Sequence, residues 1–224
     1  MKRIAPVLLL AGAVAGTSAA ELETLDQRYS YTLGVRMARM LKAEGIGELD
    51  GAAFGEAVAD VINGRPLQLT EEEMEAVLKA RAERIRRQAQ VRAEAALARS
   101  RAFLEENARK PGVQVLPGGV QYRVLEEGSG TPPTLDDQVK VHYEGRTLDG
   151  RKFDSSRDRG EPAVFALRGV IKGFSEALTH MKPGSRWEVF IPPELAYGAQ
   201  GAGDVIGPNE ALVFDLELLE VMKR

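Results

Sequence analysis

The sequence predicts an α+β protein in which a helical N-terminal part precedes an antiparallel sheet covered by one short helix. Three observations support this prediction. Between residues 22 and 110, the spacing of apolar residues and the composition are those of helices. After the break at Lys110-Pro111-Gly112, apolar residues alternate with polar ones, as on strands. Only Gly173–His180 returns to helical spacing in this part, so one helix would cover the sheet.

The bulk properties are those of an ordinary globular protein. The chain has 224 residues, which is enough for one or two domains with apolar cores. Its formal net charge of −3 offers no broad positive field for nucleic acid. Because the chain contains no cysteine, disulfides, thiolate metal sites, a cysteine nucleophile and a lipidated N-terminal cysteine are excluded.

The first twenty residues have the layout of a secretory signal peptide. Lys2 and Arg3 give a basic start, residues 7–14 form a short apolar core, and Ser18 and Ala20 are placed as at a cleavage site. The alternative is an uncleaved anchor, but a membrane-spanning helix needs ~20 apolar residues. We therefore expect cleavage after Ala20, export to the periplasm and no membrane span. Association with the outer membrane is left open.

Two helices are predicted between residues 21 and 68. A charged, glycine-containing stretch ends the first helix, Asp50 is a good N-cap for the second, and Asn63-Gly64 stops it. Helices this short bury too little surface to be stable alone, so we expect residues 21–68 to form a homodimer. The apolar stripe of the first helix consists of Leu22, Leu25, Tyr29, Leu33, Met37 and Met40.

Residues 69–110 are predicted to form one long helix. Thr70 and Glu73 have the pattern of a capping box, and no glycine or proline follows before Pro111. The middle is rich in Ala, Arg, Glu and Gln, which favours helix but gives no continuous apolar face. Its basic run 81–92 could bind nucleic acid or anionic lipid. We favour a solvated spacer, because acidic residues interleave and the arginines surround the axis.

Residues 111–224 are predicted to form the sheet domain, with turns at Gly118-Gly119 and Asp149-Gly150 and a last strand over 211–221. The other strands are recognised by alternating residues that would face the core. These are Val113 and Val115; Val120, Tyr122 and Val124; Val139, Val141 and Tyr143; Ala163, Phe165 and Leu167; and Trp187, Val189 and Ile191.

Few residues of this domain offer covalent or metal chemistry. His142 and His180 lack the spacing of metal ligands. Ser155-Ser156 follows Asp154, but no histidine base is evident beside it. No glycine-rich loop joins a strand to a helix as nucleotide sites require. We therefore expect no metal, no cofactor and no nucleophile, and in their place a small apolar pocket with few polar groups.

Several long motifs resemble those of FKBP-type peptidyl-prolyl cis–trans isomerases. They are VHYEGRTLDGRKFDSSRDRGEP from Val141, GVIKGFSEAL from Gly169, MKPGSRWEVFIPPELAYGAQG from Met181 and ALVFDLELLEV from Ala211. The resemblance covers residues 112–224, with the motifs in family order. The helical N-terminal part is similar in architecture to the periplasmic, dimeric subgroup of macrophage infectivity potentiator (Mip) and FkpA proteins.

This resemblance implies a half-barrel of antiparallel strands wrapped around a short helix, with a proline pocket between them. It implies that the Ile171 N–H and the Tyr197 hydroxyl bind substrate carbonyl groups, and that Asp154 and Arg159 form a polar pair at the pocket edge. The catalytic positions by resemblance are Tyr143, Asp154, Ile171 and Tyr197. The substrate-binding positions are Phe153, Arg159, Val170, Phe174, Val205, Ile206 and Phe214, with Phe174 at the floor, where many members have tryptophan.

Two positions depart from the family pattern. Ala163 stands where an aromatic wall residue is common, which would enlarge one side of the pocket and puts the affinity for macrolide inhibitors in doubt. Ala202 stands at the rim, where some members carry histidine, and could alter the sequence preference. Neither change removes a group that the chemistry needs.

Together these features predict an isomerase that accelerates rotation about X–Pro bonds in exported proteins and so assists their folding. The barrier is ~18–20 kcal/mol, and the twisted amide loses its resonance, so a shaped, dry site is sufficient. Its partners would be proline-containing unfolded or partly folded polypeptides. The alternative is a chaperone or adhesion module that binds apolar segments, with catalysis secondary. Whether Asp154 acts on the twisting carbonyl or only orients Tyr143 and Arg159 is left open.

Overall fold

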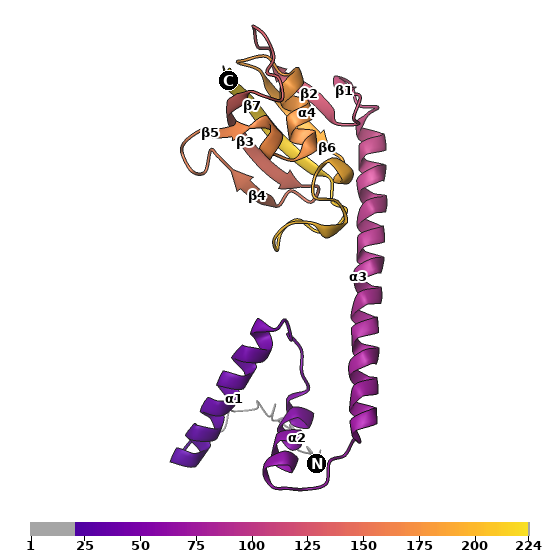
Figure 1. The fold of residues 1–224 in the computed structure, drawn as a ribbon, viewed down its shortest axis with the longest axis vertical. Helices are drawn as coiled ribbons and strands as arrows, with labels where there is room; N and C mark the ends of the chain where they lie inside the picture. The colour runs from indigo at the N-terminus through magenta and orange to yellow at the C-terminus, as the bar shows by residue number, and fades with distance from the viewer. Residues whose placement is uncertain (1–20, 224) are drawn as a thin grey trace, which may run out of the picture. The chain divides into compact units, whose positions relative to one another are not determined.

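The computed structural model describes residues 21–223 (Figure 1). The predicted signal peptide, residues 1–20, lies outside the described residues. The chain divides into a first unit that ends at Thr70 and a second that begins at Glu71, and each is described by itself. The domain boundaries expected after residues 20, 68 and 110 stay predictions. No helix within 21–223 has both the length and the apolar character needed to cross a bilayer.

The first unit contains helices α1 (Leu25–Ala43) and α2 (Gly51–Ile62). Thr24 begins α1 through a capping box that we did not predict, in which the Gln27 N–H donates to the Thr24 hydroxyl at 3.2 Å. The predicted N-cap Asp50 is confirmed, because its carboxylate accepts from two backbone N–H groups at 3.0 Å.

The apolar stripe of α1 is not covered by any of the residues that the structure describes. No residue of α1 is buried, and Leu25 and Tyr29 are 80% and 63% exposed. Ile62 at the end of α2 is 76% exposed. This first unit therefore leaves in water the side chains that an amphipathic helix normally buries.

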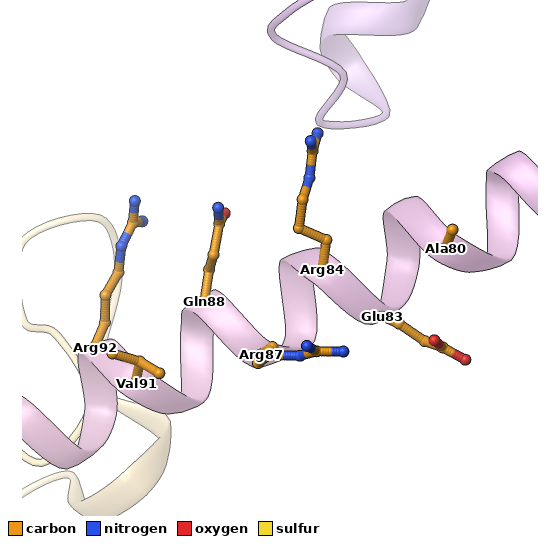
Figure 2. A pocket seen from close by; sticks show the side chains of 7 residues that line it. All are labelled: Ala80, Glu83, Arg84, Arg87, Gln88, Val91 and Arg92. Carbon is orange, nitrogen blue, oxygen red and sulfur yellow. The ribbon is translucent and has the colours of Figure 1, made fainter.

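Helix α3 (Glu71–Asn107) runs for 37 residues without interruption, as predicted, and is ~55 Å long at ~1.5 Å per residue. Its first part is exposed. A hollow of about 620 Å³ on its surface is lined by residues of α3 alone. Figure 2 shows Arg84, Gln88 and Arg92 pointing to one side of the helix there, away from Glu83 and Arg87.

The end of α3 packs on the sheet of the second unit. The rings of Phe103 and Phe190 lie 5.8 Å apart, and Ser100 and Asn107 are 1% and 2% exposed. The prediction of a solvated spacer concerned the basic run 81–92, which is exposed, and the docking of this last part was not predicted. The contact is made partly by small and polar residues, which a search for an apolar face does not count.

One antiparallel sheet makes up most of the rest of the second unit, in the order β1-β2-β6-β7-β3-β4. Strands β4 and β5 pair with successive halves of one edge of β3, while β7 pairs with the other edge along its whole length. The strands are β1 (Val113–Val115), β2 (Gln121–Glu126), β3 (Gln138–Thr147), β4 (Lys152–Ser155), β5 (Ala163–Ala166), β6 (Arg186–Ile191) and β7 (Leu212–Met222).

Helix α4 (Lys172–His180) covers the apolar face of this sheet. Val139, Val141 and Tyr143 of β3 face the core with exposures of 0%, 0% and 6%, as their alternation predicts. At Gly173 a Cβ would lie 2.3 Å from Ile191 Cγ2, so the close approach of α4 to β6 requires glycine. The predicted α+β fold class is confirmed. One detail differs, because Leu167 lies in a short 3₁₀ turn after β5.

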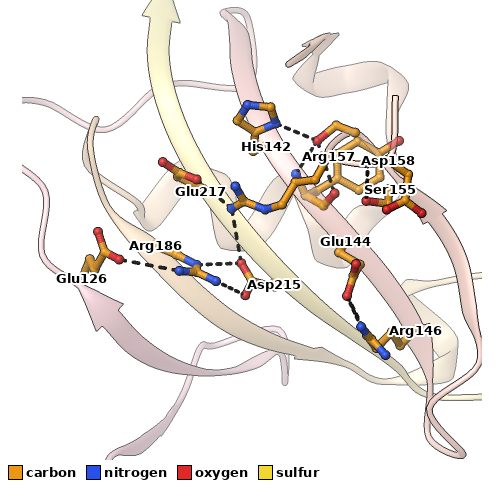
Figure 3. Close-up of polar contacts among 12 residues, drawn as sticks. Glu126, His142, Glu144, Arg146, Ser155, Arg157, Asp158, Arg186, Asp215 and Glu217 are labelled. Carbon is orange, nitrogen blue, oxygen red and sulfur yellow. Dashed lines mark hydrogen bonds and ion pairs between the residues drawn. The ribbon is translucent and has the colours of Figure 1, made fainter. Parts of the chain in front are cut away.

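The opposite face of the sheet carries ion pairs between neighbouring strands (Figure 3). Arg186 on β6 forms a two-bond pair with Asp215 on β7, with distances of 2.9 and 2.6 Å. Arg157 donates to Glu217 at 2.7 Å. The side chains in these pairs are about one-third exposed, so they favour the register without dominating stability.

Candidate functional site

An aromatic cavity of about 330 Å³ lies between β3, β4, α4 and the segment after β6. It gathers all of the predicted site residues except Arg159, Val205 and Ile206, and adds Phe165 and Gly169, which we did not predict. Its lining residues are Tyr143, Phe153, Asp154, Phe165, Gly169, Val170, Ile171, Phe174, Tyr197 and Phe214. We refer to it as the aromatic cavity.

Gly145 allows two walls of the aromatic cavity to form. A Cβ at this position would lie 2.5 Å from Phe153 Cζ and 2.8 Å from Phe214 Cε1. These two rings meet edge to face, with centroids 5.6 Å apart. The sequence shows the glycine on a strand, but it does not show which rings approach it.

Phe174, which the resemblance places at the floor of the pocket, is one of the residues that line the aromatic cavity. Its ring is 5% exposed and makes T-shaped contacts with Phe214, Tyr143 and Phe165 at centroid distances of 5.3, 5.9 and 6.0 Å. Ala163 and Phe165 lie two residues apart on β5 and so point to the same side. Phe165 therefore supplies an aromatic wall close to the position that Ala163 leaves small.

A polar trio lies at the edge of the aromatic cavity. The Tyr143 hydroxyl donates to Asp154 Oδ2. Arg159 donates from Nη1 to Asp154 Oδ1 at 2.5 Å and from Nη2 to the Tyr143 hydroxyl at 3.0 Å. The structure thus brings Arg159 to the edge of the cavity through Tyr143 and Asp154, and both oxygens of the carboxylate have partners.

The surroundings of this trio fix its protonation. Burial and then the hydrogen bond to Asp154 raise the pKa of Tyr143 above its ordinary value. Burial acts to raise the pKa of Asp154, but the hydrogen bonds from Tyr143 and Arg159 outweigh it and leave that pKa below its ordinary value. At neutral pH the trio therefore consists of a neutral phenol, a carboxylate and a guanidinium.

Two hydrogen-bond donors of the aromatic cavity are available to a ligand. Ile171 precedes α4, and its carbonyl accepts the Phe174 N–H at 3.0 Å. Its own N–H and the hydroxyl of Tyr197 have no partner among the residues that the structure describes. Tyr197 is 40% exposed. The cavity thus offers two donors to a substrate with carbonyl groups.

A second hollow of about 320 Å³ adjoins the aromatic cavity and shares Phe153, Asp154 and Tyr197 with it. Val205 and Ile206 line this hollow rather than the cavity. Ala202, the second departure from the family pattern, lies beside them. A peptide bound in the cavity can therefore extend along the loop that carries these residues.

A histidine does lie beside Ser156, which the sequence did not reveal. His142 Nδ1 is 3.0 Å from Ser156 Oγ, and that oxygen also accepts the Tyr143 N–H at 2.9 Å. His142 lies on β3 and Ser156 directly follows β4, so their distance in sequence hides the contact. Ser156 is 0% exposed, so its hydroxyl supports the backbone of Tyr143 and cannot reach a substrate.

The larger hollow on α3 (Figure 2) lacks the features of a site. Its walls are flexible side chains of one exposed helix, whereas ligand sites are enclosed and bring a few polar groups together. Within residues 21–223, no group of three or more histidine or acidic side chains could hold a metal ion. The aromatic cavity is therefore the candidate functional site.

Comparisons with known protein families agree with this choice. A family model described as FKBP-type peptidyl-prolyl cis-trans isomerase matches residues 129–219, which include the whole aromatic cavity. A second model, described as the domain amino terminal to FKBP-type peptidyl-prolyl isomerase, matches residues 26–124. The two models together cover most of the chain.

Individual relatives match along nearly the whole length. The peptidyl-prolyl cis-trans isomerase Mip of Coxiella burnetii is 44% identical over all of both chains. The outer membrane protein MIP of Legionella longbeachae is 40% identical, with 96% of this chain and 94% of the relative covered. The crystal structure of FkpA from Escherichia coli superposes with a TM-score of 0.73 at 35% identity, over 91% of this chain and 99% of the other.

Proposed function

Because the chain belongs to the family of FKBP-type peptidyl-prolyl cis–trans isomerases, we propose that its aromatic cavity is where X–Pro bonds rotate. The chain is a peptidyl-prolyl cis–trans isomerase, and what is proposed is the role of each residue. The supporting observation is the aromatic cavity itself, with apolar rings on several sides and two donors without partners among the described residues.

The proline ring of a substrate enters the aromatic cavity and lies over Phe174, between the rings that surround it. The Ile171 N–H and the Tyr197 hydroxyl bind carbonyl groups of the substrate and hold the chain while the amide turns. A planar amide is more dipolar than a twisted one, so the apolar walls disfavour the planar ground state. An acceleration of a millionfold corresponds to lowering the barrier by about 8 kcal/mol.

Asp154 orients the other two members of the polar trio. Both of its oxygens are occupied, one by Tyr143 and one by Arg159, so little of its charge is free to act on a substrate carbonyl. In this role the carboxylate fixes the Tyr143 ring, which forms one wall of the aromatic cavity. Asp154 is thus a positioning residue.

A proline-isomerisation assay on a short X–Pro peptide and on a slowly refolding protein tests the site. Tyr197→Phe should lower kcat/KM about tenfold, the effect of losing a hydrogen bond worth ~1.4 kcal/mol in the transition state. Tyr122→Phe is the matched control, because the Tyr122 hydroxyl bonds Gln114 outside the aromatic cavity. A wild-type protein without activity would overturn the isomerase assignment, and a fully active Tyr197→Phe would overturn the role of that hydroxyl.

We propose that residues 21–68 form the interface of a homodimer. The support is the uncovered apolar stripe of α1, of which Leu33 and Met37 are 44% and 39% exposed. Sedimentation of the full chain should give a dimer that Leu33→Glu converts to a monomer. Lys42→Glu, which changes an exposed polar residue on the side of the same helix opposite the stripe, should leave the dimer intact. A monomeric wild type would refute the interface.

We propose that the protein is exported to the periplasm and assists the folding of exported polypeptides. The basic, apolar and small-residue regions of residues 1–20 support export, and N-terminal sequencing of the mature protein should begin at Glu21. The alternative is a chaperone function that is separate from catalysis. Tyr197→Phe separates the two, because it should slow isomerisation and still suppress aggregation of an unfolded protein. Parallel loss of both activities would contradict a separate function.

A further inference from the structure

We propose that helix α3 positions the Tyr197 loop, residues 197–207, through Asn209 and Ser100. In this view α3 is not only a spacer, because it also fixes the position of a loop of the isomerase site. The role rests on the proposed function of the Tyr197 hydroxyl. It adds two positioning residues that do not themselves line the aromatic cavity.

Asn209 joins the Tyr197 loop to α3. Its backbone N–H donates to the carbonyl of Gly198, the residue after Tyr197, at 2.7 Å. Its side-chain Nδ2 donates to the carbonyl of Ala93 on α3 at 3.1 Å. Asn209 is the one non-glycine residue between 21 and 223 with a positive φ, at 56°. Asparagine tolerates this left-handed conformation better than other side chains do, which explains its presence at the junction.

Ser100 completes the junction from the helix side. Its hydroxyl donates to the Asn209 carbonyl at 2.9 Å and accepts the Ala211 N–H at 2.9 Å. The residue is 1% exposed, so both backbone groups would lose their partners if α3 moved away. Buried polar groups without partners are costly. The helix is therefore fixed in one register against residues 209–211.

Hydrogen bonds within the Tyr197 loop hold its residues together. The position of the loop therefore depends on where its ends are attached. Ala202 and Ile206 exchange backbone hydrogen bonds of 2.9 and 3.1 Å. The Gly207 N–H donates to the carboxylate of Glu210, a residue that is only 5% exposed, at 2.9 Å. At Gly201 a Cβ would lie 2.3 Å from the Ile206 carbonyl oxygen. A loop tied in this way moves as one piece, and Asn209 holds it at Gly198.

A second polar contact between α3 and the sheet supplies a matched comparison. The Asn107 side chain, 2% exposed, donates to Gln121 at 3.0 Å, and Gln121 donates to the Leu104 carbonyl at 2.8 Å. This contact is as buried as that of Ser100, but it joins α3 to β2 and does not touch the Tyr197 loop. Loss of either contact should loosen α3, but only the contact of Ser100 is connected to the Tyr197 loop.

Point variants of the full chain test this role with the peptide assay. Asn209→Gly keeps the left-handed backbone and removes the side-chain bond to the Ala93 carbonyl on α3, and Ser100→Ala removes the hydroxyl that binds the backbone at residues 209 and 211. Each should lower kcat/KM about fivefold, which corresponds to ~1 kcal/mol, the net worth of one hydrogen bond. The loss should appear mainly in kcat, because the misplaced donor is the Tyr197 hydroxyl. Asn107→Ala should lower the melting temperature about as much as these two variants do, but it should leave kcat/KM unchanged.

A double-mutant cycle with Tyr197→Phe gives the decisive readout. Once the hydroxyl is gone, Asn209→Gly should have almost no further effect on kcat/KM. An equal effect in both backgrounds would overturn the positioning role, as would equal activities of Asn209→Gly and Asn107→Ala. These outcomes differ from failure of the proposed function, in which the wild type itself is inactive or Tyr197→Phe is fully active.

Discussion

Replacing Tyr143 by phenylalanine and Asp154 by alanine, singly and together, tests how the polar trio works. Tyr143 is 6% exposed, and phenylalanine fills the same space, so the first change removes only the hydroxyl. That hydroxyl binds a carboxylate, and such bonds contribute ~1.5 kcal/mol or more. The Asp154 side chain is 43% exposed, so water replaces the lost partner. For Asp154→Ala we therefore expect the free energy of unfolding to fall by only about 1 kcal/mol.

The kinetic effects of these two changes should not add. If Asp154 acts through Tyr143, either change releases the same ring, and the double variant should be about as slow as the slower single variant. The coupling should approach about tenfold in kcat/KM, or ~1.4 kcal/mol. Kinetics should be measured under kcat/KM conditions at neutral pH, with melting curves to confirm that all variants are folded. Additive effects would refute the positioning role and favour a direct action of the carboxylate on the substrate.

Acid titration of the wild type provides a check on the same trio. The pKa of Asp154 lies below its ordinary value of 3.8. A depressed carboxyl pKa means that the stabilisation is fully present above pH 3.8 and is lost as the pH falls through the pKa of the folded state. Isomerase activity should therefore stay constant from neutral pH down to about pH 4. A loss of activity centred between pH 5 and 7 would contradict this assignment.

Three further predictions follow from close contacts and from one buried carboxylate. Gly145→Ala should push two phenylalanine rings into the aromatic cavity, cost about 1–3 kcal/mol of stability and reduce activity in the peptide assay. Gly173→Ala, with its Cβ 2.3 Å from Ile191, should destabilise the fold by a similar ~1–3 kcal/mol in denaturant unfolding. Asp137 has a pKa of about 2, chiefly because of a backbone hydrogen bond from Thr134 and a bond from Lys223. Wild-type stability should thus decline from pH 3.8 towards pH 2, and Asp137→Asn should weaken this decline.

The aromatic cavity could be predicted from the sequence because its walls come from residues with strong local patterns. Alternation on β3 placed Tyr143 inward, and helical spacing placed Phe174 on the buried face of α4. The resemblance to the family motifs then indicated that these inward-facing residues line one pocket. Phe165 was predicted to face the core but was not assigned to the site, because a strand pattern gives the side of the sheet and not the distance to a cavity.

Contacts between distant polar residues could not be predicted in the same way. Ser100 and Asn209 are 109 residues apart in the chain, and His142 and Ser156 lie on opposite sides of a turn. Each of these residues looks like an ordinary surface residue in sequence. Periodicity reports where apolar groups are buried, whereas a buried polar group is explained only by its partner. The docking of α3 was missed for this reason.

The chemistry of the contact between α3 and the sheet decides what the helix can do. An apolar contact tolerates small shifts, because burial has little directionality. The hydrogen bonds of Ser100 and Asn209 at 2.9 and 3.1 Å are directional and fail when the helix slides or turns. A helix held by such bonds transmits its position to the residue after Tyr197. Prolyl isomerisation needs no reagent, only correctly placed walls and donors, so a displaced hydroxyl is enough to slow it. Control of catalysis through α3 therefore requires no change in the chemistry of the aromatic cavity.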